Sequence, residues 1–176
     1  MVSTTGFSQV AKKSAGILAY RLKNELMEVF LVHPGGPFFY GKDLGAWSIP
    51  KGEFDDMEIP LVAAKREFLE ETGFVPDGNF IELSPVKLKS GKFVFAWAVD
   101  RDIDETKIKS NVFEMEWPPK SGKLREFSEI DKAEWFDISE AIKKINQNQA
   151  AFLEELDKLL TIKKIKNSKE EEEKKS

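Results

Sequence analysis

Several residue types are missing or scarce in this chain, and each absence excludes a class of site. The 176 residues contain no cysteine and a single histidine, His33. Without cysteine there is no disulfide framework, no thiolate metal site and no thiol nucleophile. A Ser-His-Asp triad would have to use His33, and a multi-histidine zinc site is excluded. We therefore expect any bound metal ion to have oxygen ligands. His33, at the end of a predicted strand, is expected to be structural, and a role as a catalytic acid or base is the alternative.

The chain also lacks an excess of positive charge and any long apolar run. Its formal net charge of −4 gives no general attraction to duplex nucleic acid or to an anionic membrane. No apolar run approaches the ~20 residues that span a bilayer, and the N-terminal segment does not resemble a signal peptide. These features predict a cytoplasmic protein, and they leave the oligomeric state open.

The composition, 41% hydrophobic and 33% charged, is typical of one globular domain with a sizeable core. We expect an N-terminal lead-in over residues 1–14 and a folded domain over residues 15–162. Residues 163–176 contain almost nothing apolar beside their lysines and glutamates. This composition predicts a frayed or disordered tail.

Hydrophobic patterning predicts an α+β fold. Residues 15–22 and 27–34 are expected to form a hairpin, followed by a glycine-rich loop over residues 35–47. A helix is predicted over Pro60–Thr72, because proline is tolerated in a first helical turn and Gly73 is well placed as a C-terminal cap.

The second half of the chain is less regular. We expect two strands within residues 79–100 joined by a turn near Ser90 and Gly91, then an irregular connection over residues 101–125. A short strand at 132–138 should precede two helices, and Asp137 and Asn146 are their expected N-caps. Since strands and helices do not alternate in strict βαβ order, α+β is favoured over a doubly wound sheet.

The predicted helix carries three acids on one edge. On a helical wheel, Glu67, Glu70 and Glu71 occupy an arc of roughly 100°, opposite an apolar packing face. Clusters of oxygen ligands suit Mg²⁺ or Mn²⁺, and a bound dication would turn their mutual repulsion into attraction. The alternative is a solvated helix face that happens to be acidic.

The spacing of residues 52–74 favours the metal site. The segment resembles the Nudix box, G-x5-E-x7-R-E-U-x-E-E-x-G-U, where U is a bulky apolar residue, and every fixed position is filled. An aliphatic residue is more usual at the first U. The flanking segments also fit the family, so the resemblance extends over residues 15–162. The fixed positions are Gly52, Glu58, Arg66, Glu67, Phe68, Glu70, Glu71, Gly73 and Phe74.

The resemblance implies an α/β/α sandwich built on a mixed β-sheet. It also implies Mg²⁺-dependent hydrolysis of a nucleoside diphosphate linked to another group, X, with Mn²⁺ as a possible substitute. Glu67, Glu70 and Glu71 would bind the metal, and Glu70 or Glu71 would be the principal ligand.

Other box residues would support the metal ligands. Arg66 would orient a glutamate of the box, and Glu58 would help to hold the loop before the helix. Gly52 and Gly73 would permit tight backbone turns.

Family members often recruit a further glutamate near the C-terminal end as a ligand or as the general base. Glu129 is the expected residue here, Glu126 is second, and Glu114 and Glu116 are weaker candidates. An ordinary exposed loop acid is the alternative for Glu129.

Three residues before the box are candidates for substrate binding. Lys51 could contact a phosphate, or could be an ordinary surface lysine. Trp47 and Tyr40, around the glycine-rich loop, could stack on a nucleobase, although packing within the core or the loop is an equal alternative.

The substrate is less defined than the family. The WSIPKG motif and the strand GKFVFAWAVD are similar to those of asymmetric diadenosine tetraphosphate hydrolases and NTP pyrophosphohydrolases. A tyrosine expected near residues 93–97 is missing, as is the proline near 88–89 that marks ADP-ribose hydrolases. NTPs and dinucleoside polyphosphates therefore lead, and the alternatives are a Nudix-fold nucleotide sensor without activity and an RNA 5′-end pyrophosphohydrolase.

Overall fold

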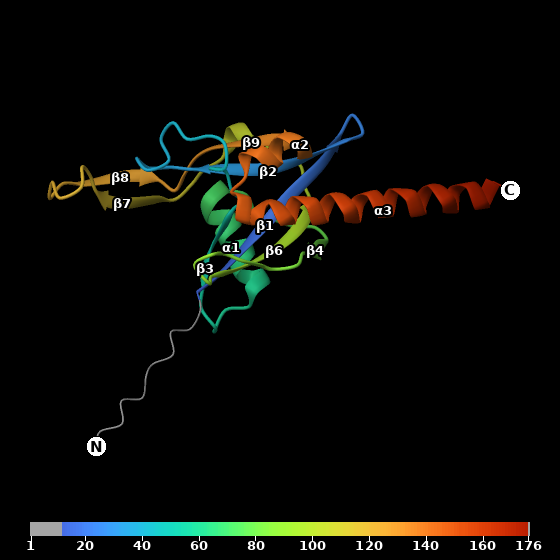
Figure 1. The fold of residues 1–176 in the computed structure, drawn as a ribbon, viewed down its shortest axis with the longest axis horizontal. Coiled ribbons are helices and arrows are strands. Elements are labelled where there is room, and N and C mark those ends of the chain that lie inside the picture. The colour runs from blue at the N-terminus through green and yellow to red at the C-terminus, as the bar shows by residue number, and fades with distance from the viewer. Residues whose placement is uncertain (1–11, 176) are drawn as a thin grey trace, which may run out of the picture.

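A mixed β-sheet forms the centre of the molecule. The structure, a computed structural model, describes residues 12–175 (Figure 1). The main strands are β1 (Lys13–Lys23), β2 (Leu26–Pro34), β6 (Phe93–Asp100) and β9 (Ile130–Asp137). Short strands β3 (Lys51–Phe54), β4 (Phe80–Glu82) and β5 (Val86–Lys87) pair with their edges or ends. The order is β4-β6-β1-β2-β9, with β1 and β6 parallel and the other pairs antiparallel.

Helices cover both faces of this sheet. The helix α1 (Pro60–Thr72) packs against β1 and β3 through Ala63, Ala64 and Phe68. The opposite face is covered by α2 (Ile138–Lys144) and by the first turns of α3 (Ala150–Lys175). Successive β1 residues therefore point into two different cores, as the period of two in a strand requires. The α/β/α sandwich with a mixed sheet is confirmed.

Several local predictions are also confirmed. The first hairpin forms, with Asn24 and Glu25 at its turn in the left-handed region. The turn before β6 closes through the Gly91 N–H, which donates to the Leu88 carbonyl. The carboxylate of Asp137 caps α2 by accepting from the Glu140 N–H. Asn146 caps a 3-10 turn, η2 (Gln147–Gln149), and α3 follows directly.

The predicted irregular connection over residues 101–125 is wrong. It contains a 3-10 turn, η1 (Glu105–Lys107), and strand β7 (Val112–Glu116), which pairs antiparallel with β8 (Leu124–Ser128). These two strands form a separate sheet that projects from the domain (Figure 1). Charged residues and two prolines at its tip masked the alternation of its strands.

The prediction of a frayed tail also differs from the structure. The helix α3 continues to Lys175 and extends away from the domain, although all of its residues beyond Leu160 are exposed (Figure 1). Lysine and glutamate are good helix formers, and pairs such as Glu170 and Lys174 stand four residues apart, so helix formation here does not need a packed face. The domain limits of 15–162 stay a prediction, and most of the expected lead-in, residues 1–11, lies outside the described residues.

Among residues 12–175 there is no helix long and apolar enough to cross a membrane. The cytoplasmic location stays a prediction.

Candidate active site

The box helix lies against the strand in which the box begins. Gly52 is the second residue of β3, and a Cβ built on it would stand 2.0 Å from the carboxyl carbon of Glu67. The carboxylate of Glu67 thus occupies the space that any larger residue at position 52 would need. Gly52 has no positive φ, so the expectation of a tight turn there is wrong, and close approach is the physical reason for glycine.

Gly73 has the role that the sequence predicts. It caps α1 in the left-handed conformation, with φ of 80°, and its N–H donates to the Leu69 carbonyl. The helix therefore ends one turn beyond Glu70, and the chain turns away from the acidic edge.

Glu71 faces the start of β3 from inside the protein. Its Oε2 accepts the Lys51 N–H at 3.1 Å. Burial raises the pKa of Glu71 to about 8, because a charged carboxylate is disfavoured away from water. Burial also lowers the pKa of Lys51, with the Lys92 charge as a second cause. The carboxylate of Glu71 and the ammonium of Lys51 are therefore two largely buried titratable groups that interact electrostatically.

Arg66 joins the loop before the helix to the helix itself. Its guanidinium donates two hydrogen bonds to Glu58, at 2.8 and 2.9 Å, and a third to Glu67 at 2.6 Å. It also contacts both oxygens of Glu70 at 3.4 Å. The bond from Arg66 holds the pKa of Glu58 below its ordinary value. This geometry fits the expected roles of Arg66 and Glu58 in orienting the box.

Glu129 is brought to the box from the far end of the sequence. It lies between β8 and β9, half-buried, and its pKa is raised first by burial and then by the charge of Glu70. Its own charge in turn raises the pKa values of Glu67 and Glu71. The four carboxylates therefore influence one another, whereas the other candidates, Glu126, Glu114 and Glu116, are exposed along the projecting hairpin.

A cleft of about 200 Å³ opens beside these acids. Lys51, Glu71 and Glu129 are among its lining residues, as are the aromatic residues Phe39 and Trp47. The remaining lining residues come from β2, the 46–48 segment, the start of β9 and the turn before α3: Val32, Pro34, Ala46, Ser48, Ile130, Asn146 and Gln149. A larger groove of about 490 Å³ lies between the β1–β2 turn and α3, but none of the box residues lines it.

The aromatic candidates are placed differently from one another. Trp47 lines the cleft but is only 1% exposed, and its Nε1 donates to Asp43 while its ring packs edge-on against Phe136. Tyr40 is 87% exposed and is not among the residues that line the cleft. Phe39, its neighbour, is the loop aromatic at the cleft, so the choice of Tyr40 is not supported by this arrangement.

Sequence reasoning missed Gln149 entirely. This buried side chain accepts from the Ile49 N–H at 3.0 Å and exchanges hydrogen bonds with Ser48. It fastens the turn before α3 to the segment that leads into the box. No local pattern marks Gln149, because its partners lie about one hundred positions earlier.

His33 is buried and serves as an anchor. Its Nδ1 lies 2.8 Å from Asp131, and its Nε2 lies 2.7 Å from the Lys42 carbonyl oxygen. It thereby fastens the glycine-rich loop to β9, in agreement with a structural rather than catalytic use.

A family model of the NUDIX domain matches residues 11–156, most of the chain. This chain belongs to the Nudix family. With its box complete, it is a hydrolase of phosphoanhydride bonds.

Solved Nudix structures share this fold. A C. elegans Ap4A hydrolase in a binary complex is 21% identical, with a TM-score of 0.57, over 86% of this chain and 98% of the other. The NUDIX domain of NrtR from Shewanella oneidensis, complexed with ADP ribose, is 14% identical, with a TM-score of 0.59, over 90% and 94%. A mutT/nudix family protein from Listeria innocua is 15% identical, with a TM-score of 0.58, over 88% and 96%. No curated protein matched the sequence.

The Nudix acids provide suitable donors for a hard divalent cation. Glu67, Glu70, Glu71 and Glu129 offer carboxylate oxygens only, which is the ligand type that Mg²⁺ and Mn²⁺ prefer. In the arrangement that the structure describes for residues 12–175, no three acidic or histidine side chains converge enough to hold an ion. In the same arrangement the Arg66 guanidinium donates to Glu67 and contacts Glu70. The carboxylate oxygens of these four glutamates are thus chemically suitable ligands for Mg²⁺ or Mn²⁺.

Proposed function

We propose that this Nudix protein is a Mg²⁺-dependent pyrophosphohydrolase that cleaves a phosphoanhydride bond in a nucleoside diphosphate derivative, with NTPs and dinucleoside polyphosphates as the leading substrates. One observation carries the proposal: Glu129, from outside the box, lines the same cleft as the box acid Glu71 and Lys51. A merely solvated acidic helix would not have a partly buried acid from a distant segment set beside it.

In this proposal Glu67, Glu70 and Glu71 hold the metal, and Mn²⁺ can replace Mg²⁺. When bound, the ion would neutralise charge on the phosphate oxygens, which a bare acidic surface repels. Arg66 would act by orienting Glu67 and Glu70. The Nudix family generally requires divalent cations, and the all-oxygen donor set supports the same requirement here.

Other side chains would bind the substrate and move the proton. The ammonium of Lys51 would contact a phosphate, and the exposed ring of Phe39 would receive a nucleobase. A water would attack phosphorus and lose its proton to the carboxylate of Glu129, while the phosphoanhydride bond to the leaving phosphate breaks. The raised pKa of Glu129 supports a base role, since a more basic carboxylate accepts a proton more readily.

The test is a panel of nucleotides, each incubated with Mg²⁺, with Mn²⁺ and with EDTA, and with products identified by mass. The panel contains ATP, diadenosine tetraphosphate, ADP-ribose and an RNA bearing a 5′ triphosphate. We expect metal-dependent cleavage of ATP or diadenosine tetraphosphate. Tight binding without any product would instead identify a nucleotide sensor, and selective cleavage of the RNA would identify a 5′-end pyrophosphohydrolase.

A further inference from the structure

The projecting β7–β8 hairpin has two unlike faces. Cross-strand pairing places Phe113 opposite Phe127 and Met115 opposite Arg125 on one face, and these apolar side chains are half-buried. The other face is exposed throughout and carries Val112, Glu114, Glu116, Leu124, Glu126 and Ser128. A hairpin that merely faced solvent would not need one apolar side, so the half-buried face packs on something.

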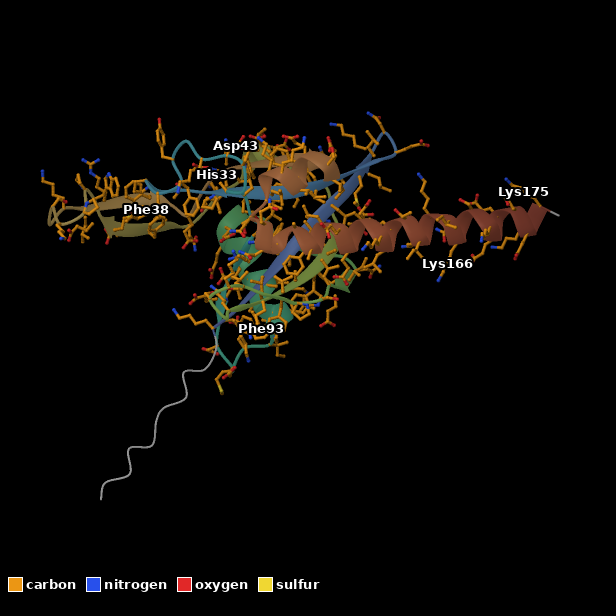
Figure 2. The ribbon with its side chains drawn as sticks, in the orientation of Figure 1. His33, Phe38, Asp43, Phe93, Lys166 and Lys175 are labelled. Atoms are coloured by element: carbon orange, nitrogen blue, oxygen red, sulfur yellow. The ribbon has the colours of Figure 1, made fainter. Side chains whose placement is uncertain are left out.

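The half-buried face packs on the start of the glycine-rich loop. The ring of Phe113 lies under Gly36, where a Cβ would approach it to 3.0 Å. The ring of Phe38 meets Trp117, just beyond β7, edge to face at 5.6 Å. Figure 2 shows Phe38 beside the hairpin. The next residue after Phe38 is Phe39, which lines the cleft, so the hairpin contacts the loop segment that carries this ring.

The base of the hairpin is tied to the acids. The Glu129 N–H donates to the Asn111 carbonyl, and the Glu129 carbonyl accepts from the Gly35 N–H, both at 2.9 Å. The Asn111 N–H donates to the carbonyl of Glu70 at 2.9 Å. The backbone of the expected general base is thus held between the box helix and the first residue of the glycine-rich loop.

The other half of the loop has its own anchors. Asp43 bonds to Lys144 and Trp47, and the Gly45 and Trp47 N–H groups donate to carbonyls of α2. These contacts fix residues 43–47 without the hairpin. The segment from Gly36 to Lys42 relies instead on His33, on two turn hydrogen bonds and on the Phe113 and Trp117 rings.

We infer that the β7–β8 hairpin positions the cleft wall, and that Trp117 is a positioning residue that acts on the substrate through Phe38 and Phe39. Trp117 is not among the residues that line the cleft, so its effect on the reaction is indirect. The effect of Trp117 on substrate binding rests on the proposed function, whereas its effect on the order of residues 36–42 does not.

The experiment compares Trp117→Ala, Trp117→Phe and Phe38→Ala with a matched control, Leu124→Ala, on the exposed face of the same hairpin. Hydrogen exchange of residues 36–42 is measured by mass spectrometry, and kinetics are measured with ATP and diadenosine tetraphosphate. We expect Trp117→Ala to speed exchange of this segment and to raise KM about three- to tenfold with kcat little changed, as loss of an aromatic pair implies. Trp117→Phe should keep both the exchange rate of residues 36–42 and KM close to their wild-type values. Leu124→Ala should match wild type in both.

The double variant Trp117→Ala/Phe38→Ala completes the test. Because both changes remove the same ring contact, their effects on KM should be less than additive. Unchanged exchange in residues 36–42 of Trp117→Ala, or fully additive effects, would overturn the inference. If the wild type cleaves no nucleotide while the exchange changes as expected, the proposed function fails and the positioning of the loop stands.

Discussion

The carboxylate of Glu67 lies where the first side-chain carbon of any larger residue at position 52 would stand, 2.0 Å from its carboxyl carbon. The box glycine and the box glutamate, fifteen positions apart, are therefore two halves of one steric fit. Glu67 cannot move aside freely, because its side chain is only 12% exposed and is bonded to Arg66. This relationship explains the spacing between the start of the box and its helix in physical terms.

Gly52→Ala should displace the Glu67 carboxylate. We expect kcat to fall by about tenfold or more, and the free energy of unfolding to fall by about 1–2 kcal/mol, as is usual when a methyl group is forced into a packed site. Enzyme kinetics and urea denaturation would measure the two effects separately. A variant with wild-type kcat would show that the Glu67 position is not needed for activity.

Glu70→Gln and Glu71→Gln should each abolish Mg²⁺-dependent phosphate release while the protein stays folded. Each change keeps the shape of the side chain and removes the negative charge that a dication requires. Circular dichroism would check the fold, and Glu170→Gln, on the exposed end of α3, is the matched control. The metal assignment is wrong if both variants keep their activity.

Glu71→Gln should also stabilise the metal-free protein, and the gain should depend on pH. The pKa of Glu71 is about 8 in the folded protein against 4.5 as its ordinary value, so the folded state retains a proton that the unfolded state has lost. Stability from this group is complete below about pH 4.5 and is lost as pH rises towards 8. Glutamine carries no charge, so the free energy of unfolding of Glu71→Gln relative to wild type should rise between pH 4.5 and pH 8 and then level off. The rise can be at most roughly 1.4 kcal/mol per pH unit, and we expect a few kcal/mol in total.

Urea unfolding in EDTA at pH 5 and pH 8 would measure this gain. Glu58→Gln provides a control of opposite sign, because Arg66 lowers the pKa of Glu58. Glu58 contributes stability above its ordinary pKa and loses it as pH falls, so Glu58→Gln should destabilise the protein at pH 8. An equal gain for Glu71→Gln at both pH values would contradict the buried-acid interpretation.

Arg66→Lys should lower kcat/KM about tenfold, because a lysine cannot make the paired bonds to Glu58 while it also reaches Glu67. Glu58→Gln should give a smaller loss through the same network. In a double-mutant cycle of the two changes, the losses should be less than additive. Independent effects would mean that Glu58 does not act through Arg66.

Much of the fold was predictable because local patterns carry it. Pro60 and Gly73 mark the ends of α1, Asp137 marks the start of α2, and alternation marks the first hairpin. The hairpin β7–β8 was not predictable from the sequence. Its short strands are half-exposed, and their apolar face is defined only by the glycine-rich loop that covers that face in the structure. The helical continuation of α3 does not follow from composition, because a segment rich in charge and poor in apolar residues predicts disorder, whereas lysine and glutamate individually favour helices.

By itself, the sequence determined the family and the acidic edge of α1, because box spacing and helical periodicity are local properties of a chain. Tertiary structure decided which distant residues meet that edge. Glu129 reaches the acids only through the hairpin and β9, and Gly52 meets Glu67 only because β3 pairs with β1 beneath the helix. It also placed Phe39 rather than Tyr40 at the cleft, since side-chain direction in a loop depends on the contacts that anchor it.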